Sequence, residues 1–446
     1  MFRGELIGVT ACLLLGATAS AAQPVGPDLI VSQMNDVIRW GSLSGRTSWG
    51  FGTAACNAGD TPAVWVRMTD QHPVISTGVY KVQGGRIRQI GVGWAKHGFA
   101  TLNMPSDCGV CPGEMDSTRL WPGCVDPYSA VQNGIQSGLG PRSQINPYTG
   151  VFTFPVDYTG YPPAADTLAR RVVVENAEID PSLNAGAVYV AEGQYVSPDE
   201  AAAGHGWNSV SYRPFTVSAG PNFTPVYSGG EPVRRASPAI MLWHEADAGV
   251  RVERVNIPGE GVLYVASRAV EVGDGRWRYD YAVQNVTSDR AVGWLEIPTG
   301  CASADGVEQS IPRHHSGEAW KHAPWGVDKD VVRLRLATTP FPADPDAAAV
   351  RWGTLASWRF ESDRPPTEGE VAVGLFKPGT PASVAAPAVV PHPGPDMTGD
   401  GFIDMFDFDA YILAFEEGLP IADYNGDGFL DLFDLDAFVA AFEAGC

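Results

Sequence analysis

Motifs that would assign an enzymatic activity are missing from this chain. Its 446 residues contain no G-x-S-x-G nucleophile elbow, no P-loop, no G-x-G-x-x-G and no H-E-x-x-H. After the N-terminus, no run of 18 apolar residues could span a membrane. No basic cluster offers a footprint for nucleic acid. These absences argue against a transmembrane or nucleic-acid-binding protein and leave any catalytic role without a signature.

Positive charge is absent from the end of the chain. Residues 396–446 hold 13 Asp or Glu and no Lys or Arg, so they carry −13 of the formal net charge of −21. The 395 residues before them carry only −8. The acidity is therefore concentrated in one segment, where it indicates cation binding rather than a uniformly acidic surface.

Glycine and proline are abundant, at 51 and 36 residues, well above the ~12% that the two contribute to an average protein. Together with 13 Trp and many short β-branched runs, this composition is typical of loop-rich all-β proteins. We predict a mainly β fold. It consists of β-sandwich domains, the second immunoglobulin-like, followed by a small α-helical domain with tandem calcium loops.

The first 22 residues have the pattern of a secretory signal peptide. Arg3 precedes an apolar core from Leu6 to Leu15, and Ala19-Ser20-Ala21 supplies small residues for cleavage. We therefore expect a secreted protein that is extracellular or attached to a cell surface.

The body of the chain divides into two predicted β regions, 23–230 and 231–380. In the second, apolar residues from Trp277 to Val283 alternate with Arg278 and Asp280, which predicts aromatic side chains on one face of a sheet and charge on the other. Predicted strands follow at sandwich-like spacing, at 261–272, 276–286, 291–298, 330–337, 350–360 and 369–376. The first region has predicted strands at 63–68, 150–156, 171–175, 187–196 and 210–217, a cysteine-containing loop, and a short helix after Ser197.

Residues 381–395 are rich in proline and alanine. Such a composition favours extended polyproline geometry, at about 3.1 Å per residue. We therefore predict a semi-rigid linker that holds the acidic C-terminal segment away from the body.

Two calcium loops are predicted in the C-terminal segment. A hard cation takes six to eight oxygens, which an EF-hand-type loop supplies from positions 1, 3, 5, 7, 9 and 12, with glycine at position 6 for a sharp turn. Both loops follow this pattern, except that Asp replaces Glu at position 12. The predicted ligands to two Ca²⁺ ions are Asp396, Thr398, Asp400, Phe402 (through its carbonyl), Asp404 and Asp407, then Asp423, Asn425, Asp427, Phe429 (carbonyl), Asp431 and Asp434.

The two loops belong to a tandem repeat. Residues 396–418 and 423–445 are identical at 14 of 23 aligned positions. Each loop is followed by apolar residues at helical spacing, which predicts two short helices that pack face to face. These residues are Phe408, Tyr411, Ile412 and Phe415, then Leu435, Phe438, Val439 and Phe442.

A loop and an exiting helix without an entering helix, duplicated and with Asp at position 12, resembles the type I dockerin module. The resemblance covers residues 396–446 and implies calcium binding by the residues above. It also implies docking onto a cohesin-like or other surface-anchoring protein, commonly in extracellular complexes that degrade polysaccharides. At loop positions 10 and 11 this chain departs from the family, with Met405-Phe406 and Leu432-Phe433. The terminal Gly445-Cys446 resembles a dockerin variety linked to surface anchoring.

Four cysteines crowd the first region, at Cys56, Cys108, Cys111 and Cys124. They could bind zinc through four thiolates, or form two disulfides in any of three connectivities. The signal peptide favours disulfides. Cys301 and Cys446 remain, and Cys446 could be a free or attached thiol.

Other candidate groups in the body are scattered. His314, Glu318 and His322 would share a face if their segment were helical, as metal ligands might, but Pro312, Gly317 and Pro324 favour a loop. Asp70, Glu192, Asp199 and Glu245 are candidates for a glycosidase pair, which requires two carboxyl groups about 5–10 Å apart. His72 and His97 are either functional or structural.

Two functions follow from the sequence. The first is a non-enzymatic, secreted β-sandwich protein tethered to a surface or extracellular complex, in a polysaccharide-related context. The alternative is a polysaccharide-degrading glycoside hydrolase that uses the same module, acting on O-glycosyl bonds.

Overall fold

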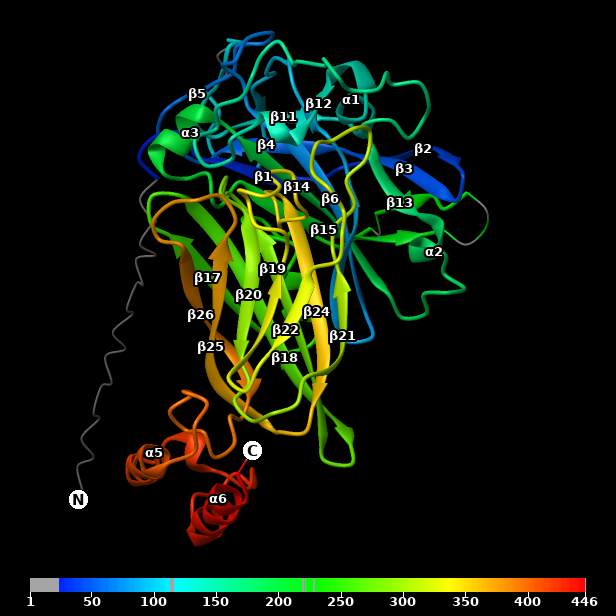
Figure 1. Cartoon of the computed structure of the whole chain (residues 1–446). Helices are drawn as coiled ribbons and strands as arrows, with labels where there is room; N and C mark the ends of the chain where they lie inside the picture. The colour runs from blue at the N-terminus through cyan, green and yellow to red at the C-terminus, as the bar shows by residue number, and fades with distance from the viewer. Residues whose placement is uncertain (1–23, 113–115, 219, 221, 228, 446) are drawn as a thin grey trace, which may run out of the picture.

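The computed structural model describes residues 24–112, 116–218, 220, 222–227 and 229–445. The predicted signal peptide and Cys446 lie outside these residues. The chain is mainly β, with several antiparallel sheets and a small helical region at the C-terminal end (Figure 1). Among the described residues, no helix has the length and apolar character to cross a membrane.

The N-terminal region is built on one large antiparallel sheet and a smaller four-stranded sheet. The large sheet runs in the order β16 (Pro225–Val226), β15 (Val210–Val217), β14 (Val188–Val196), β6 (Val74–Gln83), β7 (Arg86–Val92), β13 (Val172–Glu175), β3 (Arg46–Phe51) and β2 (Val37–Leu43), with β8 (Ala95–Lys96) and β12 (Leu139–Gly140) beside it. The small sheet runs β1 (Leu29–Gln33), β4 (Thr53–Asn57), β11 (Cys124–Tyr128) and β9 (Met104–Pro105). A two-stranded pair joins β10 (Arg119–Leu120) to β5 (Ala63–Val64).

Short helices connect these strands. They are α1 (Ala130–Asn133), α2 (Asn176–Ile179), α3 (Pro198–Ala203) and α4 (Met241–Ala246), with 3-10 turns η1 (Gln136–Gly138) and η2 (Arg142–Gln144). The predicted helix after Ser197 is confirmed as α3, with Pro198 in its first turn. Of the predicted strands at 63–68 and 150–156, only Ala63–Val64 and a single bridge from Phe152 to Ile145 form.

The second region is a sandwich of two five-stranded sheets. One sheet runs β17 (Arg251–Ile257), β18 (Gly261–Gly273), β19 (Arg276–Asn285), β24 (Thr354–Ser362) and β21 (Asp305–Ser310). The other runs β22 (Gly326–Lys329), β23 (Arg333–Ala337), β20 (Val292–Pro298), β25 (Pro366–Leu375) and β26 (Ser383–Pro391). Alternate residues of both sheets fill one core, as the predicted period of two requires.

The charged face of β19 is not exposed to solvent, contrary to the usual alternation. Asp280 is fully buried, and its carboxylate accepts a 2.6 Å hydrogen bond from Arg359 on β24. The reason is that the N-terminal region covers this face, where Arg86 of β7 donates to the hydroxyl and carbonyl oxygens of Ser357 at 3.1 and 2.7 Å.

The two β regions share a core across the predicted boundary at residue 230. One buried cluster joins Tyr80 and Val190 to Trp243, Tyr264 and Leu355. A polar network lies beside it. Glu192 on β14 accepts hydrogen bonds from the Tyr80 hydroxyl (2.8 Å), the Ala239 amide (2.6 Å) and Gln284 on β19 (2.6 Å). The body is therefore joined by both apolar and polar contacts.

The prediction of a linker at 381–395 was wrong. Residues Ser383–Pro391 form β26, which pairs with β25 along its whole length. Ala386, Ala388 and Val390 enter the sandwich core at alternate positions. Proline is tolerated because β26 is an edge strand, where the missing amide of Pro387 costs no ladder hydrogen bond.

The C-terminal region consists of α5 (Met405–Glu416), η3 (Pro420–Ala422) and α6 (Leu432–Ala444). The apolar faces predicted for the two helices do form their joint core. At its centre, the rings of Tyr411 and Phe438 stack with centroids 3.9 Å apart. The region is small and helical, as predicted, and lies at the end of the sandwich away from the N-terminal region (Figure 1).

The four clustered cysteines form two disulfides, Cys56–Cys108 and Cys111–Cys124. The disulfide interpretation is thus confirmed over the zinc alternative. The bonds attach Cys108 and Cys111, which follow β9, to β4 and β11, the central strands of the small sheet.

Candidate calcium loops and docking surface

The first predicted calcium loop is organised by two buried carboxylates. Asp396, at loop position 1, accepts hydrogen bonds from the amides of Gly399 (2.8 Å), Asp400 (3.1 Å) and Gly401 (3.0 Å). Asp407, at position 12, accepts from the amides of Thr398 and Asp404, both at 2.9 Å. Position 1 and position 12 thus draw the two ends of the loop together, as an ion-binding loop requires.

The second loop repeats this arrangement. Asp434 accepts from the amides of Asn425 (3.1 Å) and Asp431 (2.9 Å), and Asp423 accepts from Gly428 (2.9 Å). In both loops the aspartate at position 9, Asp404 or Asp431, is also the N-cap of the following helix, within a capping box closed by the position 12 aspartate.

The glycine at position 6 of each loop adopts the sharp turn that was predicted for it. Gly401 has φ of +86° and Gly428 has φ of +83°, in the left-handed region that side chains other than glycine rarely adopt. The chain can therefore reverse at this point and turn the later loop positions back towards the first.

Two properties of the loop carboxylates bear on whether the loops could hold a cation. Asp423 Oδ1 is buried and has no hydrogen-bond partner among the described residues. Burial and the nearby Asp407 carboxylate raise the pKa of Asp396. Across the described part of the chain, however, no three His, Cys, Asp or Glu side chains converge into a metal-holding group. Instead, the loop carboxylates face backbone amides, and the predicted set also relies on Thr398, Asn425 and two backbone carbonyls, which lie outside those residue types.

Each repeat exposes the same three large apolar side chains. Phe402, Met405 and Phe406 of the first repeat correspond to Phe429, Leu432 and Phe433 of the second, and their exposed fractions lie between 63% and 73%. They occupy loop positions 7, 10 and 11. We call these six residues the apolar loop surface. Because both repeats expose large apolar side chains at the same loop positions, these residues are candidates for an interaction site.

The C-terminal region is held directly against the sandwich. His392, just after β26, is buried, and its Nε2 lies 2.9 Å from the carbonyl oxygen of Ile421 in η3, to which it donates when Nδ1 accepts from the Gly394 amide at 3.1 Å. At the first loop, a Cβ on Gly401 would lie 3.1 Å from the side chain of Val332. The expected separation of the module from the body is therefore not observed.

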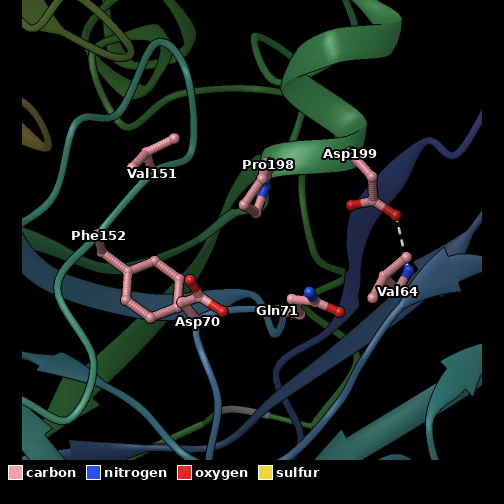
Figure 2. A pocket seen from close by; sticks show the side chains of 7 residues that line it. All are labelled: Val64, Asp70, Gln71, Val151, Phe152, Pro198 and Asp199. Atoms are coloured by element: carbon pink, nitrogen blue, oxygen red, sulfur yellow. Dashed lines mark hydrogen bonds between the residues drawn. The ribbon is translucent and has the colours of Figure 1, made fainter.

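Two of the four candidate carboxylates in the body share a pocket. Asp70 and Asp199 line a cavity of about 400 Å³ with Phe152 at its wall (Figure 2). Asp199 is fixed there, because its carboxylate accepts from the amides of Val64 (2.6 Å) and Glu200 (3.0 Å), whereas Asp70 is exposed.

The other two carboxylates have separate structural partners. Glu192 lies in the buried network between the two β regions, and Glu245 pairs with Arg234 at 3.3 Å. Of the four candidate carboxylates, the structure thus places only Asp70 and Asp199 in one pocket among the described residues.

The segment with His314, Glu318 and His322 is a loop, and its groups do not converge. Glu318 accepts from the Arg142 amide at 2.8 Å, and burial raises its pKa. The His314 ring packs against Trp320 with centroids 5.2 Å apart, and burial lowers its pKa to about 3. Each group thus has a structural role of its own.

Comparisons with known proteins do not assign a family. No family model matches the chain, and no curated protein matches it. A solved structure titled "Biofilm associated protein - B domain" is 9% identical over 90% of this chain and 93% of its own, with a TM-score of 0.14. A score this low carries no argument about fold or function.

Proposed function

We propose that this chain is a secreted protein with an immunoglobulin-like sandwich body, tethered to a cell surface or extracellular complex by residues 396–446. In this proposal the C-terminal region is a dockerin-like module that binds two Ca²⁺ ions and docks onto a cohesin-like or other surface-anchoring protein. The observation that carries the proposal is the apolar loop surface, because both repeats expose it at equivalent positions.

The position of this surface links docking to calcium. Phe402 and Phe429 follow the turn glycine of each loop, and the other four residues lie in the first turns of α5 and α6 or directly before them. A cation held by the loop carboxylates would fix the backbone that presents these side chains. Since they are large aromatic or aliphatic side chains, they would supply a large contact area to an apolar partner surface.

The docking surface is tested by replacing one aromatic side chain in each repeat. Phe406→Ser with Phe433→Ser should reduce the cell-bound fraction of the secreted protein at least about tenfold, because buried aromatic anchors dominate interface affinity. The measurement is the ratio of cell-bound to released protein, made in the producing organism with calcium present.

The matched control replaces exposed apolar residues of the body. Leu183 and Val110 are 66% and 91% exposed, so Leu183→Ser with Val110→Ser removes apolar surface without touching the module. This variant should remain cell-bound like the wild type. Equal retention of both variants would exclude the apolar loop surface as the docking site.

The pocket with Asp70 and Asp199 favours a second candidate, a glycoside hydrolase. Two carboxylates and an aromatic ring in one cavity are the side chains that glycosidic chemistry and sugar binding use. On this hypothesis, Asp70→Asn and Asp199→Asn each abolish polysaccharide hydrolysis, measured as release of reducing ends from a panel of polysaccharides. If the wild-type protein releases none, the display function stands alone.

A further inference from the structure

A second, larger cavity of about 590 Å³ lies in the N-terminal region, between β8, β11 and α1. Its walls are largely apolar and include two segments that follow the disulfide-linked loop. The lining residues include Arg67, Lys96, Phe99, Tyr128, Ile135 and Phe154. The volume is within the range of small-molecule sites.

The charge of this cavity is opposite in sign to the net charge of the chain. Its lining holds two cations, Arg67 and Lys96, and no carboxylate, although the net charge of the protein is −21. Neither cation has an ion-pair or side-chain hydrogen-bond partner among the described residues. Arg67 is exposed at the rim, whereas Lys96 is only 8% exposed.

Aromatic rings take the place of a counter-ion at Lys96. Its Nζ lies 3.7 Å from the centre of the Tyr128 ring and 4.6 Å from that of Phe99, within cation–π range. The three N–H donors of the ammonium group have no acceptor among the described residues.

The buried carboxylate of Asp126 interacts electrostatically with Lys96, but the two form no ion pair among the described residues. Asp126, on β11, accepts instead from the Leu102 amide at 2.9 Å. Burial lowers the pKa of Lys96 to about 7 and raises that of Asp126 to about 7. An anion bound at Lys96 Nζ would therefore supply the hydrogen-bond acceptor that the described residues do not provide.

The apolar side of the cavity indicates what such an anion carries. Phe99, Phe154, Ile135 and Val156 provide aromatic and branched walls. His97 is 6% exposed, and neither of its ring nitrogens has a hydrogen-bond partner among the described residues. Two unpaired cations beside aromatic and branched walls would complement a ligand that carries a carboxylate on an aromatic ring.

We propose that this cavity binds a small aromatic carboxylate, whose carboxylate group accepts hydrogen bonds from Lys96 Nζ and Arg67. The ring of the ligand lies among Phe99, Phe154 and Ile135. This site belongs to the body and does not depend on the function of the C-terminal module.

The test uses 2-naphthylacetate as probe and 2-naphthylacetamide as its neutral counterpart, titrated into the full chain by calorimetry. We expect the acid to bind at least about tenfold more tightly than the amide, since only the acid forms charge-assisted hydrogen bonds. Lys96→Met and Arg67→Gln should each weaken binding of the acid about tenfold and leave binding of the amide unchanged.

Two further variants make the result decisive. Arg119 is an exposed cation outside the cavity, so Arg119→Gln should bind the acid like the wild type. Arg67→Gln changes an exposed side chain and keeps the test valid if Lys96→Met does not fold. The proposal is overturned if the wild type does not bind the acid, if acid and amide bind equally, or if Arg67→Gln binds the acid like Arg119→Gln.

Discussion

Removal of calcium is expected to unfold residues 396–445 and leave the sandwich intact. Without a cation, eight loop aspartates are crowded into a segment that has no Lys or Arg to neutralise them. Two Ca²⁺ ions would offset four of these charges and pull each loop closed. Binding to the folded form alone stabilises it by about 4 kcal/mol when free calcium exceeds Kd a thousandfold.

The measurement is hydrogen exchange of the full chain, read separately for α5, α6 and the strands of the body. With calcium, amides of both helices should be protected. With chelator, their protection should fall by orders of magnitude, while that of β19 and β24 remains, because those strands lie in a core that contains no calcium loop residue.

Two double variants distinguish the effect of the loop carboxylates from the effect of negative charge in general. Asp400→Ala with Asp427→Ala removes position 5 from each loop and should abolish the response to calcium. Asp409→Ala with Asp436→Ala removes the same charge from exposed positions on α5 and α6 and should preserve it. If the first double variant folds and docks like the wild type in chelator, the calcium-dependent tether is incorrect, and anchoring through Cys446 becomes the better explanation.

Replacement of Arg142 by Met is expected to destabilise the body by about 3–5 kcal/mol. The Arg142 side chain is 1% exposed and lies where the two β regions meet. Its guanidinium donates to the carbonyl oxygens of Gly93 (2.7 Å), Thr77 (2.8 Å) and Gly353 (3.3 Å). Methionine fills much of the volume but donates to none of these oxygens. The Gly353 oxygen keeps Gln89 and Tyr80 as donors, at 3.1 and 3.4 Å, so the largest loss falls on Gly93 and Thr77.

Chemical denaturation, followed by tryptophan fluorescence, measures this effect. Because Thr77 and Gly353 belong to different β regions, the midpoint should fall for the whole body in one transition rather than for one half. Arg119→Met, at an exposed position, should leave the midpoint unchanged. An unchanged midpoint for Arg142→Met would show that the hydrogen bonds of Arg142 contribute nothing to the joint between the two regions.

Local patterns predicted six of the ten sandwich strands, β18, β19, β20, β23, β24 and β25, because alternation there reports burial directly. They did not predict β17, β21 or β22. Tyr279 and Tyr281 follow the rule, and their strand is within one residue of its predicted bounds. The same reasoning missed β26, since proline and alanine are typical of both linkers and edge strands. Only the partner strand β25 distinguishes these two cases, and a partner is not a local property.

The candidate sites also differ in whether local sequence can predict them. The calcium loops are contiguous in sequence, so their spacing alone predicts the ligand set, which stays a prediction. The pocket of Asp70 and Asp199 joins residues 129 positions apart, and no spacing rule relates them. Lys96 was missed as well, although its neighbour His97 was considered, because an unpaired buried cation is visible only when the surrounding rings are in place.

The position of β26 determines how mechanical load would enter the body. Tension on an anchored C-terminal module reaches the sandwich at Pro391, which pairs with Pro366 at the end of the hairpin nearest the module. Pulling there peels β26 from β25 one hydrogen bond at a time, rather than shearing the whole ladder at once. Resistance then comes mainly from withdrawing Val390, Ala388 and Ala386 in turn from the core. If the module is anchored as we propose, the strength of the attachment under flow would be set inside the sandwich as well as at the docking surface.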